Sequence, residues 1–296
     1  VIRSDQRLPR RAERDWPVPS AGHTGDQCAM PAYLITGATD GIGRFTAESL
    51  GGAGHTVLVH GRNPGRIAAV VDAVNARGGE AFGYCADLSS LAEVRQLGEQ
   101  VSAAHPRLDG LLHNAGTYDG DYTGKRLESV DGNEYSLAVN VLAPFLLTSL
   151  LLSNVRSSGR GRILITSSIS MGAADALDDL QCNRLWTAHR AYSLSKLCDA
   201  MLAKELDARY GDAPRLCINS MDPGTVDTKM LRAGWGAWGA PVSSATTSFR
   251  MLTEPRWGQQ SGEVTCSSCA EVDDALARRR LWDACVDLTG AEYPPA

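Results

Sequence analysis

The feature that most constrains the fold of this chain is a regular alternation of short apolar segments with longer amphipathic segments, which begins after Met30. Strands are predicted over residues 33–35, 56–59, 81–85, 108–112, 163–165 and 216–218, with a weak one near Val264. Helices are predicted over 43–50, 66–76, 91–104, 128–153, 191–210, 245–252 and 272–288, the fourth of them broken near Pro144. Nearly continuous apolar strands that alternate with helices are typical of a parallel sheet with helices on both faces. The predicted fold class is therefore α/β, a doubly wound parallel sheet of about seven strands.

Residues 1–29 differ from the rest of the chain, because they are polar, contain arginine and proline, and show no periodicity. We expect them to form a disordered N-terminal tail. Residues 30–296 contain no internal repeat and no interdomain linker, and they are therefore expected to form a single domain.

The composition places the chain among soluble globular proteins, with 43% apolar and 21% charged residues. Its net charge of −5 argues against a protein that coats nucleic acid. No run of ~18 uncharged apolar residues is present, and the best candidate, 142–152, is too short, so no membrane span is expected. The eight scattered cysteines, without an apolar export signal, indicate free thiols in a reducing compartment. The predicted localisation is cytoplasmic.

A glycine-rich turn, Thr36-Gly37-Ala38-Thr39-Asp40-Gly41-Ile42-Gly43, joins the first predicted strand to the first predicted helix. In such a turn, backbone N–H groups can approach a pyrophosphate closely, and the helix N-terminus adds the positive end of its dipole. The GxxxGxG spacing at this position favours a dinucleotide site in a Rossmann-type sheet. The alternative is a tight turn without a ligand.

The end of the second predicted strand bears on the choice of cofactor. Sheets that bind NAD place an acid here for the ribose hydroxyls, but this segment reads His60-Gly61-Arg62-Asn63. The planar cation of Arg62 suits a 2′-phosphate, which predicts NADP(H) as the preferred cofactor, with NAD(H) also possible. Asp40 in the glycine turn weakens this interpretation, and an ordinary solvated charge is the alternative for Arg62.

A candidate proton-transfer pair lies in the helix predicted over 191–210. Tyr192 and Lys196 are four residues apart and therefore face the same side of that helix. A phenol has a pKa of about 10, and a nearby ammonium favours its ionised form. Ser167 and Ser168 end the fifth predicted strand, so a serine hydroxyl there could hold a carbonyl oxygen while the phenol transfers a proton.

Taken together, the motifs make the chain resemble the short-chain dehydrogenase/reductase family over about residues 32–290. The matching pieces are Thr36-Gly37-x-x-x-Gly41-x-Gly43, Asn114-Ala115-Gly116, Asn140, Ser168, Tyr192-x-x-x-Lys196 and Asp222-Pro223-Gly224. The 24-residue interval from Ser168 to Tyr192 is similar to that of the retinol dehydrogenase and WW-domain oxidoreductase branch. Leu281-Trp282 and Leu288-Thr289-Gly290 resemble the same branch.

This resemblance implies roles for individual residues. Tyr192 is implied as the general acid in reduction and the base in oxidation, and Lys196 as the residue that eases its deprotonation and holds the nicotinamide ribose. Ser168 is implied to orient the substrate carbonyl, with Ser167 and Ser170 as alternatives, and Asn140 to anchor a water of the proton relay. The implied cofactor contacts are Thr36, Gly37, Gly41, Ile42 and Gly43 at the phosphates, Asp87 and Leu88 at the adenine, Asn114, Ala115 and Gly116 along the cofactor, and Pro223, Gly224, Val226 and Thr228 at the nicotinamide end. For Asn114, stabilisation of the sheet is an equal alternative.

The segment after Gly224 is expected to form a substrate lid near residues 225–245. It contains Met230, Leu231, Trp235 and Trp238 among glycines, and Tyr118 and Tyr122 could line the opposite wall. An apolar lid with two indoles suits a hydrophobic or aromatic substrate. Anchoring of the loop to its own core or to a partner subunit is the alternative for the tryptophans.

The predicted function is an NADP-preferring oxidoreductase that transfers a hydride between the nicotinamide cofactor and a hydrophobic or aromatic ketone, aldehyde or secondary alcohol. A non-catalytic NAD(P)-binding regulator on the same fold is the alternative. The family resemblance also implies a homodimer or homotetramer. Cys266 and Cys269 without a second ligand pair are a weak sign of zinc, so no metal is predicted.

Overall fold

The computed structural model describes residues 30–118, 125–236, 239–266 and 269–295. In these ranges, seven parallel strands form one sheet with the order β3-β2-β1-β4-β5-β6-β7. The strands are β1 Ala32–Ile35, β2 Thr56–Gly61, β3 Glu80–Cys85, β4 Gly110–His113, β5 Gly161–Thr166, β6 Leu216–Met221 and β7 Val264–Thr265. Because β1 pairs with both β2 and β4, the order of strands reverses beside β1. This is the doubly wound α/β fold that the alternation predicts.

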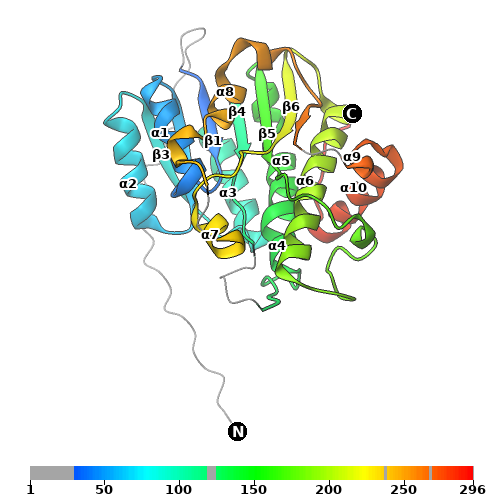
Figure 1. Cartoon of the computed structure of the whole chain (residues 1–296). Coiled ribbons are helices and arrows are strands. Elements are labelled where there is room, and N and C mark those ends of the chain that lie inside the picture. Colours follow the sequence, from blue (N-terminus) through cyan, green and yellow to red (C-terminus); the bar gives the residue numbers. More distant parts are fainter. Residues whose placement is uncertain (1–29, 119–124, 237–238, 267–268, 296) are drawn as a thin grey trace.

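Helices cover both faces of the sheet (Figure 1). The first layer contains α1 Gly41–Gly52, α2 Pro64–Asn75 and α8 Thr247–Thr253. The second contains α3 Leu91–Ala104, α4 Tyr135–Leu137, the π-helical turn η1 Ala138–Leu142, α5 Ala143–Arg156 and α6 Ala188–Tyr210, with α9 Ala270–Asp273 and α10 Ala275–Thr289 beside α6. The remaining helical segments are α7 Lys229–Trp235 and the 3₁₀ turns η2 Ala174–Ala176, η3 Val242–Ser244 and η4 Pro255–Gly258.

Side chains that alternate along a strand supply the two core layers. Leu34 and Leu58 pack under the second helical layer, whereas their neighbours Ile35 and Val59 pack under the first. All four side chains are fully buried. Such strands are apolar on both faces, which is why they form nearly continuous apolar runs in the sequence.

The helix predicted over 128–153 begins later than predicted, at Tyr135. The carboxylate of Glu134 caps it by accepting a hydrogen bond of 2.8 Å from the backbone N–H of Leu137. The preceding residues form a turn closed by a bridge between Glu128 and Glu134. Near Pro144 the α-helix is interrupted by the π-helical turn η1, and Pro144 itself lies in the first turn of α5, where its missing N–H is tolerated.

The helix predicted over 272–288 is two helices, α9 and α10. Asp274 separates them in an extended conformation, and its carboxylate accepts hydrogen bonds from the N–H groups of Leu276 and Ala277 at the start of α10. Asp favours such N-cap positions because its side chain replaces a missing backbone partner.

One helical stretch in the described residues, Tyr135–Arg156, is long and apolar enough to cross a membrane by length and composition alone. Within its most apolar 18-residue window, 83% is buried inside the fold. The absence of a membrane span therefore stays a prediction. Residues 1–29, for which a disordered tail is expected, lie outside the described residues.

Candidate active site

A cavity of about 620 Å³ opens at the carboxyl ends of the central strands. Segments that follow β1, β2, β3, β4, β5 and β6 contribute to its wall, and α7 closes one side. Ligands of doubly wound sheets bind at this end, where the strand order reverses. The predicted site residues that line the cavity are Gly37, Gly41, Ile42, Arg62, Asp87, Leu88, Asn114, Ala115, Gly116, Ser168, Tyr192, Lys196, Pro223, Gly224, Val226 and Thr228.

The glycine-rich turn after β1 forms a cradle that fits a dinucleotide phosphate. Gly37 and Gly41 have φ angles of +66° and +51°, a region that favours glycine. A Cβ on Gly37 would lie 2.8 Å from the Cα of Ala115, so the turns after β1 and β4 can only approach this closely without a side chain. The N-terminus of α1 begins at Gly41 on the cavity wall, and it presents the positive end of the helix dipole there.

Two residues of the predicted phosphate contact, Thr36 and Gly43, do not line the cavity. The Thr36 hydroxyl is buried and accepts hydrogen bonds of 3.0 and 3.1 Å from the N–H groups of Asn114 and Ala115. A Cβ on Gly43 would lie 2.3 Å from the Gly37 carbonyl oxygen and 2.4 Å from Nδ2 of Asn114. Thr36 therefore ties the turns after β1 and β4 together, and Gly43 lets α1 pack closely against them, while their contact with the cofactor phosphates stays a prediction.

Asn114 stabilises the sheet by hydrogen bonding, which is the structural alternative to a cofactor contact. Its side-chain amide donates hydrogen bonds of 3.1 and 3.3 Å to the carbonyl oxygens of Thr36 and Gly37, which ties β4 to the glycine turn. It also lines the cavity. A further tie to this turn, from His60, went unnoticed in the sequence. The buried His60 ring accepts a hydrogen bond from the Gly37 N–H at 3.2 Å and contacts the Ala86 carbonyl oxygen at 3.1 Å.

Tyr192 and Lys196 lie together on the cavity wall, as their spacing predicts. The Lys196 Nζ atom lies 5.8 Å from the centre of the Tyr192 ring. Thr187 caps the start of α6 by accepting a hydrogen bond from the Arg190 N–H, and the tyrosine follows in the second turn of the helix. Lys196 also donates hydrogen bonds of 2.8 Å to the Thr166 carbonyl oxygen at the end of β5 and to the carboxylate of Asp199.

Lys196 stays charged although its burial disfavours the ammonium form. Burial disfavours the ammonium, but attraction to Asp199 and Tyr192 and the hydrogen bond that Lys196 donates to Asp199 outweigh it and leave the pKa of Lys196 raised. The lysine is therefore a cation in a nearly closed site. A fixed positive charge at this distance stabilises a phenolate.

Of the three candidate serines after β5, Ser168 is best placed to meet a ligand. The hydroxyl of Ser167 donates a 2.7 Å hydrogen bond to the carbonyl oxygen of Lys196 and is therefore occupied in holding β5 to α6. The Ser168 oxygen accepts a 3.1 Å hydrogen bond from the Ser170 N–H, which leaves its proton available to a substrate oxygen. All three serines line the cavity.

Asn140 lies one layer behind the cavity wall, in the π-helical turn η1. Its amide exchanges two hydrogen bonds with the backbone of Thr117, at 2.8 and 2.9 Å, and donates a third, of 2.9 Å, to the hydroxyl of Ser195. That hydroxyl donates in turn to the carbonyl oxygen of Tyr192 at 2.7 Å. Asn140 thus fixes the segment after β4 against the helix that carries the tyrosine, by contacts that the sequence motif alone does not reveal.

Basic residues surround the end of the cavity near β2 and α2. Arg62 donates a 3.3 Å hydrogen bond to the hydroxyl of Tyr135, and Arg66 lies 3.9 Å from the Asp40 carboxylate. Lys229 from α7 bonds the same carboxylate. All four charged groups line the cavity. Arg66 and Lys229 were missed in the sequence because only the folded chain brings them beside the glycine turn.

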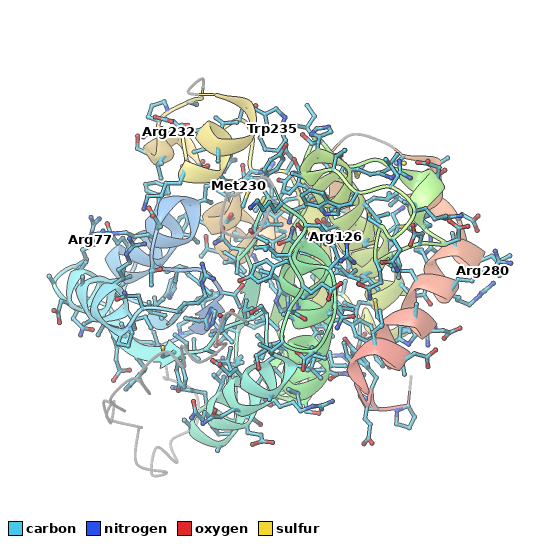
Figure 2. All side chains as sticks on the ribbon, turned by 90° about the horizontal axis from the view of Figure 1, so that it is seen from below. Arg77, Arg126, Met230, Arg232, Trp235 and Arg280 are labelled. Carbon is cyan, nitrogen blue, oxygen red and sulfur yellow. The ribbon has the colours of Figure 1, made fainter. Side chains whose placement is uncertain are left out.

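The expected lid contains a helix, α7, which Thr228 caps by accepting a hydrogen bond from the Leu231 N–H. Its Trp235 packs on Tyr118 and Tyr192, with ring centres 4.8 and 5.3 Å apart. In Figure 2, Met230 lies on the side of α7 toward the middle of the molecule and Arg232 on the outer side. Trp238 and Tyr122 lie outside the described residues.

Among the described residues, no group of three or more His, Cys, Asp or Glu side chains is arranged to hold a metal ion. Cys269 bonds the carboxylate of Glu271, and Cys266 lies against Met171. The absence of a metal stays a prediction.

Comparison with known proteins agrees with this geometry. The family described as short chain dehydrogenase matches residues 31–235. Polyprenol dehydrogenase of Mus musculus is 34% identical over 286 aligned residues, which cover 87% of this chain and 83% of that protein. Retinol dehydrogenase 14 of Homo sapiens is 30% identical over 294 aligned residues, which cover 87% and 85%. A solved short-chain dehydrogenase of Shigella flexneri, complexed with NADP, has a TM-score of 0.65 and 26% identity and covers 81% of this chain and 98% of its own.

The family match covers more than half of the chain. The glycine cradle and the Tyr192–Lys196 pair line one continuous cavity at the carboxyl ends of the strands of the doubly wound sheet. The chain belongs to the short-chain dehydrogenase/reductase family, in the branch that includes the retinol dehydrogenases, and is an oxidoreductase acting on alcohol or carbonyl groups.

Proposed function

We propose that this enzyme uses NADP(H) in preference to NAD(H) to interconvert a hydrophobic or aromatic ketone or aldehyde and its alcohol. The observation that carries the proposal is the position of Tyr192, whose ring lies close to both the Lys196 ammonium and the Trp235 indole. The phenol is thus next to a fixed cation and at the apolar end of the cavity at once.

Each side chain of the site has a separate role in the proposed carbonyl reduction. A nicotinamide held in this cavity supplies the hydride. The Tyr192 hydroxyl donates a proton to the carbonyl oxygen, the Ser168 hydroxyl donates a hydrogen bond to that oxygen, and Lys196 stabilises the phenolate left behind. In alcohol oxidation the phenolate accepts the proton instead. Asn140 keeps the tyrosine helix in register through Ser195.

The preference for NADP(H) rests on three cations, Arg62, Arg66 and Lys229, at the end of the cavity expected to hold the adenosine ribose. Guanidinium and ammonium groups suit a 2′-phosphate. Asp40 opposes this preference, but Lys229 and Arg66 already offset its charge. The similar Shigella flexneri enzyme binds NADP.

A hydrophobic substrate is supported by the other end of the cavity. Val139, Ile169, Met230, Leu231 and Trp235 line the cavity, and Ile169 and Trp235 are 61% and 41% exposed. Apolar side chains left open to water around a catalytic group favour an apolar ligand. The two similar mammalian proteins are named for polyprenol and retinol.

The deciding experiment is a panel of aliphatic, aromatic and polar ketones and aldehydes, followed by NADPH absorbance and repeated with NADH. We expect turnover of apolar carbonyls, with higher kcat/KM for NADPH. A clear preference for NADH would refute the role given to Arg62. Tight NADPH binding without turnover of any compound would instead support the non-catalytic regulator, which the intact set of Ser168, Tyr192 and Lys196 does not favour.

The cellular setting of the enzyme is part of the same proposal. We infer a cytoplasmic homodimer or homotetramer without a membrane span. Size-exclusion chromatography with light scattering measures the oligomer, and fractionation of expressing cells measures the location. Recovery in the membrane fraction would contradict the proposed location.

A further inference from the structure

A buried carboxylate that neither the cofactor cradle nor the proton-transfer pair explains lies next to the catalytic lysine. Asp199 follows Lys196 by three residues on α6, and its side chain is 2% exposed. Its Oδ2 atom accepts a 2.8 Å hydrogen bond from the lysine Nζ, and the Thr166 carbonyl oxygen accepts another of 2.8 Å. Two of the three ammonium protons are therefore bound by the protein, and burial of such an ion pair is unfavourable unless its geometry is good.

The surroundings of Asp199 leave Lys196 as its charged partner among the described residues. The thiols on which its charge acts are those of Cys198 on α6, Cys285 on α10 and Cys266 after β7. Burial raises the pKa of each thiol, so all three are uncharged at neutral pH. The charge on Asp199 therefore acts mainly on the lysine and, through it, on the phenol.

We propose that Asp199 is a positioning residue, a buried counter-ion that holds the Lys196 ammonium and weakens the positive field that this ammonium exerts on Tyr192. An ion pair presents a smaller field at a third site than the cation alone, because the two charges partly cancel. Asp199 thus makes Tyr192 a weaker acid and a stronger base than Lys196 alone would. This inference rests on the proton transfer proposed for Tyr192.

The Asp199 carboxyl group is expected to gain or lose its proton near neutral pH. Burial raises the pKa of Asp199 to about 7, against the attraction of Lys196. Above that pH the counter-ion is charged and its effect on the phenol is present. Below it the carboxyl is neutral, and Lys196 acts on the phenol alone.

The first test is a spectroscopic titration of the apo protein, which needs no substrate. Tyrosinate absorbance is measured against pH in the wild type and in Asp199→Asn, each with Tyr192→Phe as the background to be subtracted. In the Asn variant, Lys196 is expected to keep its bond to the Thr166 carbonyl oxygen and its place on the cavity wall, and the predicted direction holds while its amine remains protonated. We expect the Tyr192 phenol to ionise at a pH about one unit lower in Asp199→Asn, a tenfold change in its ionisation equilibrium.

Glu205→Gln is the matched control for the loss of a buried charge on the same helix. The Glu205 carboxylate is also largely buried, but it bonds Arg209 at 2.8 Å, outside the residues that line the cavity. This variant is expected to leave the Tyr192 titration unchanged. An unchanged or higher midpoint in folded Asp199→Asn, or an equal shift in Glu205→Gln, overturns the proposal.

A second measurement uses the wild type and keeps the proposal testable if Asp199→Asn does not fold. The ring-carbon NMR signal of Tyr192 in isotope-labelled protein is identified by its loss in Tyr192→Phe. We expect this signal to move in a separate step near pH 7, when Asp199 ionises, before its own ionisation. Ionisation of the Asp199 carboxyl, followed on its own labelled carbon, without a shift of the Tyr192 signal contradicts the proposal. Because neither titration involves turnover, a failed substrate search and a failed counter-ion role give different results.

Discussion

The indole of Trp235 lies edge-on to the ring of Tyr192, with centres 5.3 Å apart and planes inclined by 67°. It also packs on Tyr118, yet 41% of Trp235 remains exposed. The Tyr192 phenol, the proposed proton donor, is therefore covered by a side chain from α7, a seven-residue helix outside the two main layers. This contact joins the proton-transfer group to the surface that an apolar substrate would meet.

Replacing Trp235 with alanine should weaken substrate binding more than chemistry. The indole contributes apolar area to the cavity but carries no proton in the reaction, so we expect KM for an apolar ketone to rise about tenfold and kcat to change less. Trp235→Phe, which keeps an aromatic ring, should recover most of the affinity. Steady-state kinetics with one apolar and one polar ketone measure this, and equal effects on both would contradict an apolar roof.

Tyr192→Phe should abolish turnover while cofactor binding persists. The exchange removes the proton donor but keeps the ring that packs on Trp235 and Tyr118. Loss of a general acid lowers rates by about a hundredfold or more, whereas the NADPH dissociation constant should stay within about twofold. NADPH fluorescence measures binding and NADPH absorbance measures turnover. Substantial residual activity would show that another group moves the proton.

Arg62→Ala should reduce the selectivity for NADPH. If this guanidinium meets the 2′-phosphate, its loss should lower kcat/KM for NADPH about tenfold and leave the value for NADH nearly unchanged. Arg77→Ala is the control, because Arg77 is an exposed arginine that bonds Glu48 at 2.7 Å and does not line the cavity (Figure 2). Parallel losses for both cofactors in Arg62→Ala would assign this residue a general structural role.

Two glycines of α1 should respond to alanine in opposite ways. A Cβ on Gly43 would lie 2.3 Å from the Gly37 carbonyl oxygen, whereas a Cβ on Gly52 meets nothing within 4 Å. We expect Gly43→Ala to destabilise the fold by about 3 kcal/mol and to abolish NADPH binding, and Gly52→Ala to stabilise it by about 0.5–1 kcal/mol. Urea denaturation and NADPH titration test both. A well-folded, cofactor-binding Gly43→Ala would contradict the packing of this turn.

The fold was predictable because its strands carry a strong signal. Leu34 and Ile35 face opposite helical layers, so a buried parallel strand must be apolar at both positions. Helix ends were harder to predict. Glu134 and Asp274 act as caps only because the chain turns there, and neither residue interrupts the apolar periodicity strongly enough to mark a boundary.

The site was predictable where a local motif determines it, as at Tyr192 and Lys196. It was not predictable where residues distant in sequence meet. The hydrogen bond of His60 to Gly37 spans 23 positions, and the contact of Lys229 with Asp40 spans 189. Thr36 shows a structural role that the motif does not reveal, because its hydroxyl accepts a hydrogen bond from the Asn114 N–H after β4.

Acid should unfold this protein in part through His113. Burial lowers the pKa of His113 to about 3, and its Nε2 pairs with the Thr148 hydroxyl at 2.8 Å. An unfolded histidine has a pKa of about 6.5, so below that pH the unfolded chain binds a proton that the folded ring resists. Stability is therefore intact above about pH 6.5 and falls by about 1.4 kcal/mol per pH unit from there toward about pH 3. In His113→Leu, the free energy of unfolding should therefore depend less steeply on pH between about pH 6 and pH 4, by the amount that one titrating group contributes. Urea denaturation midpoints of wild type and variant, measured across that range, test this prediction. An unchanged pH dependence of stability in the variant would mean that His113 titrates alike in the folded and unfolded states.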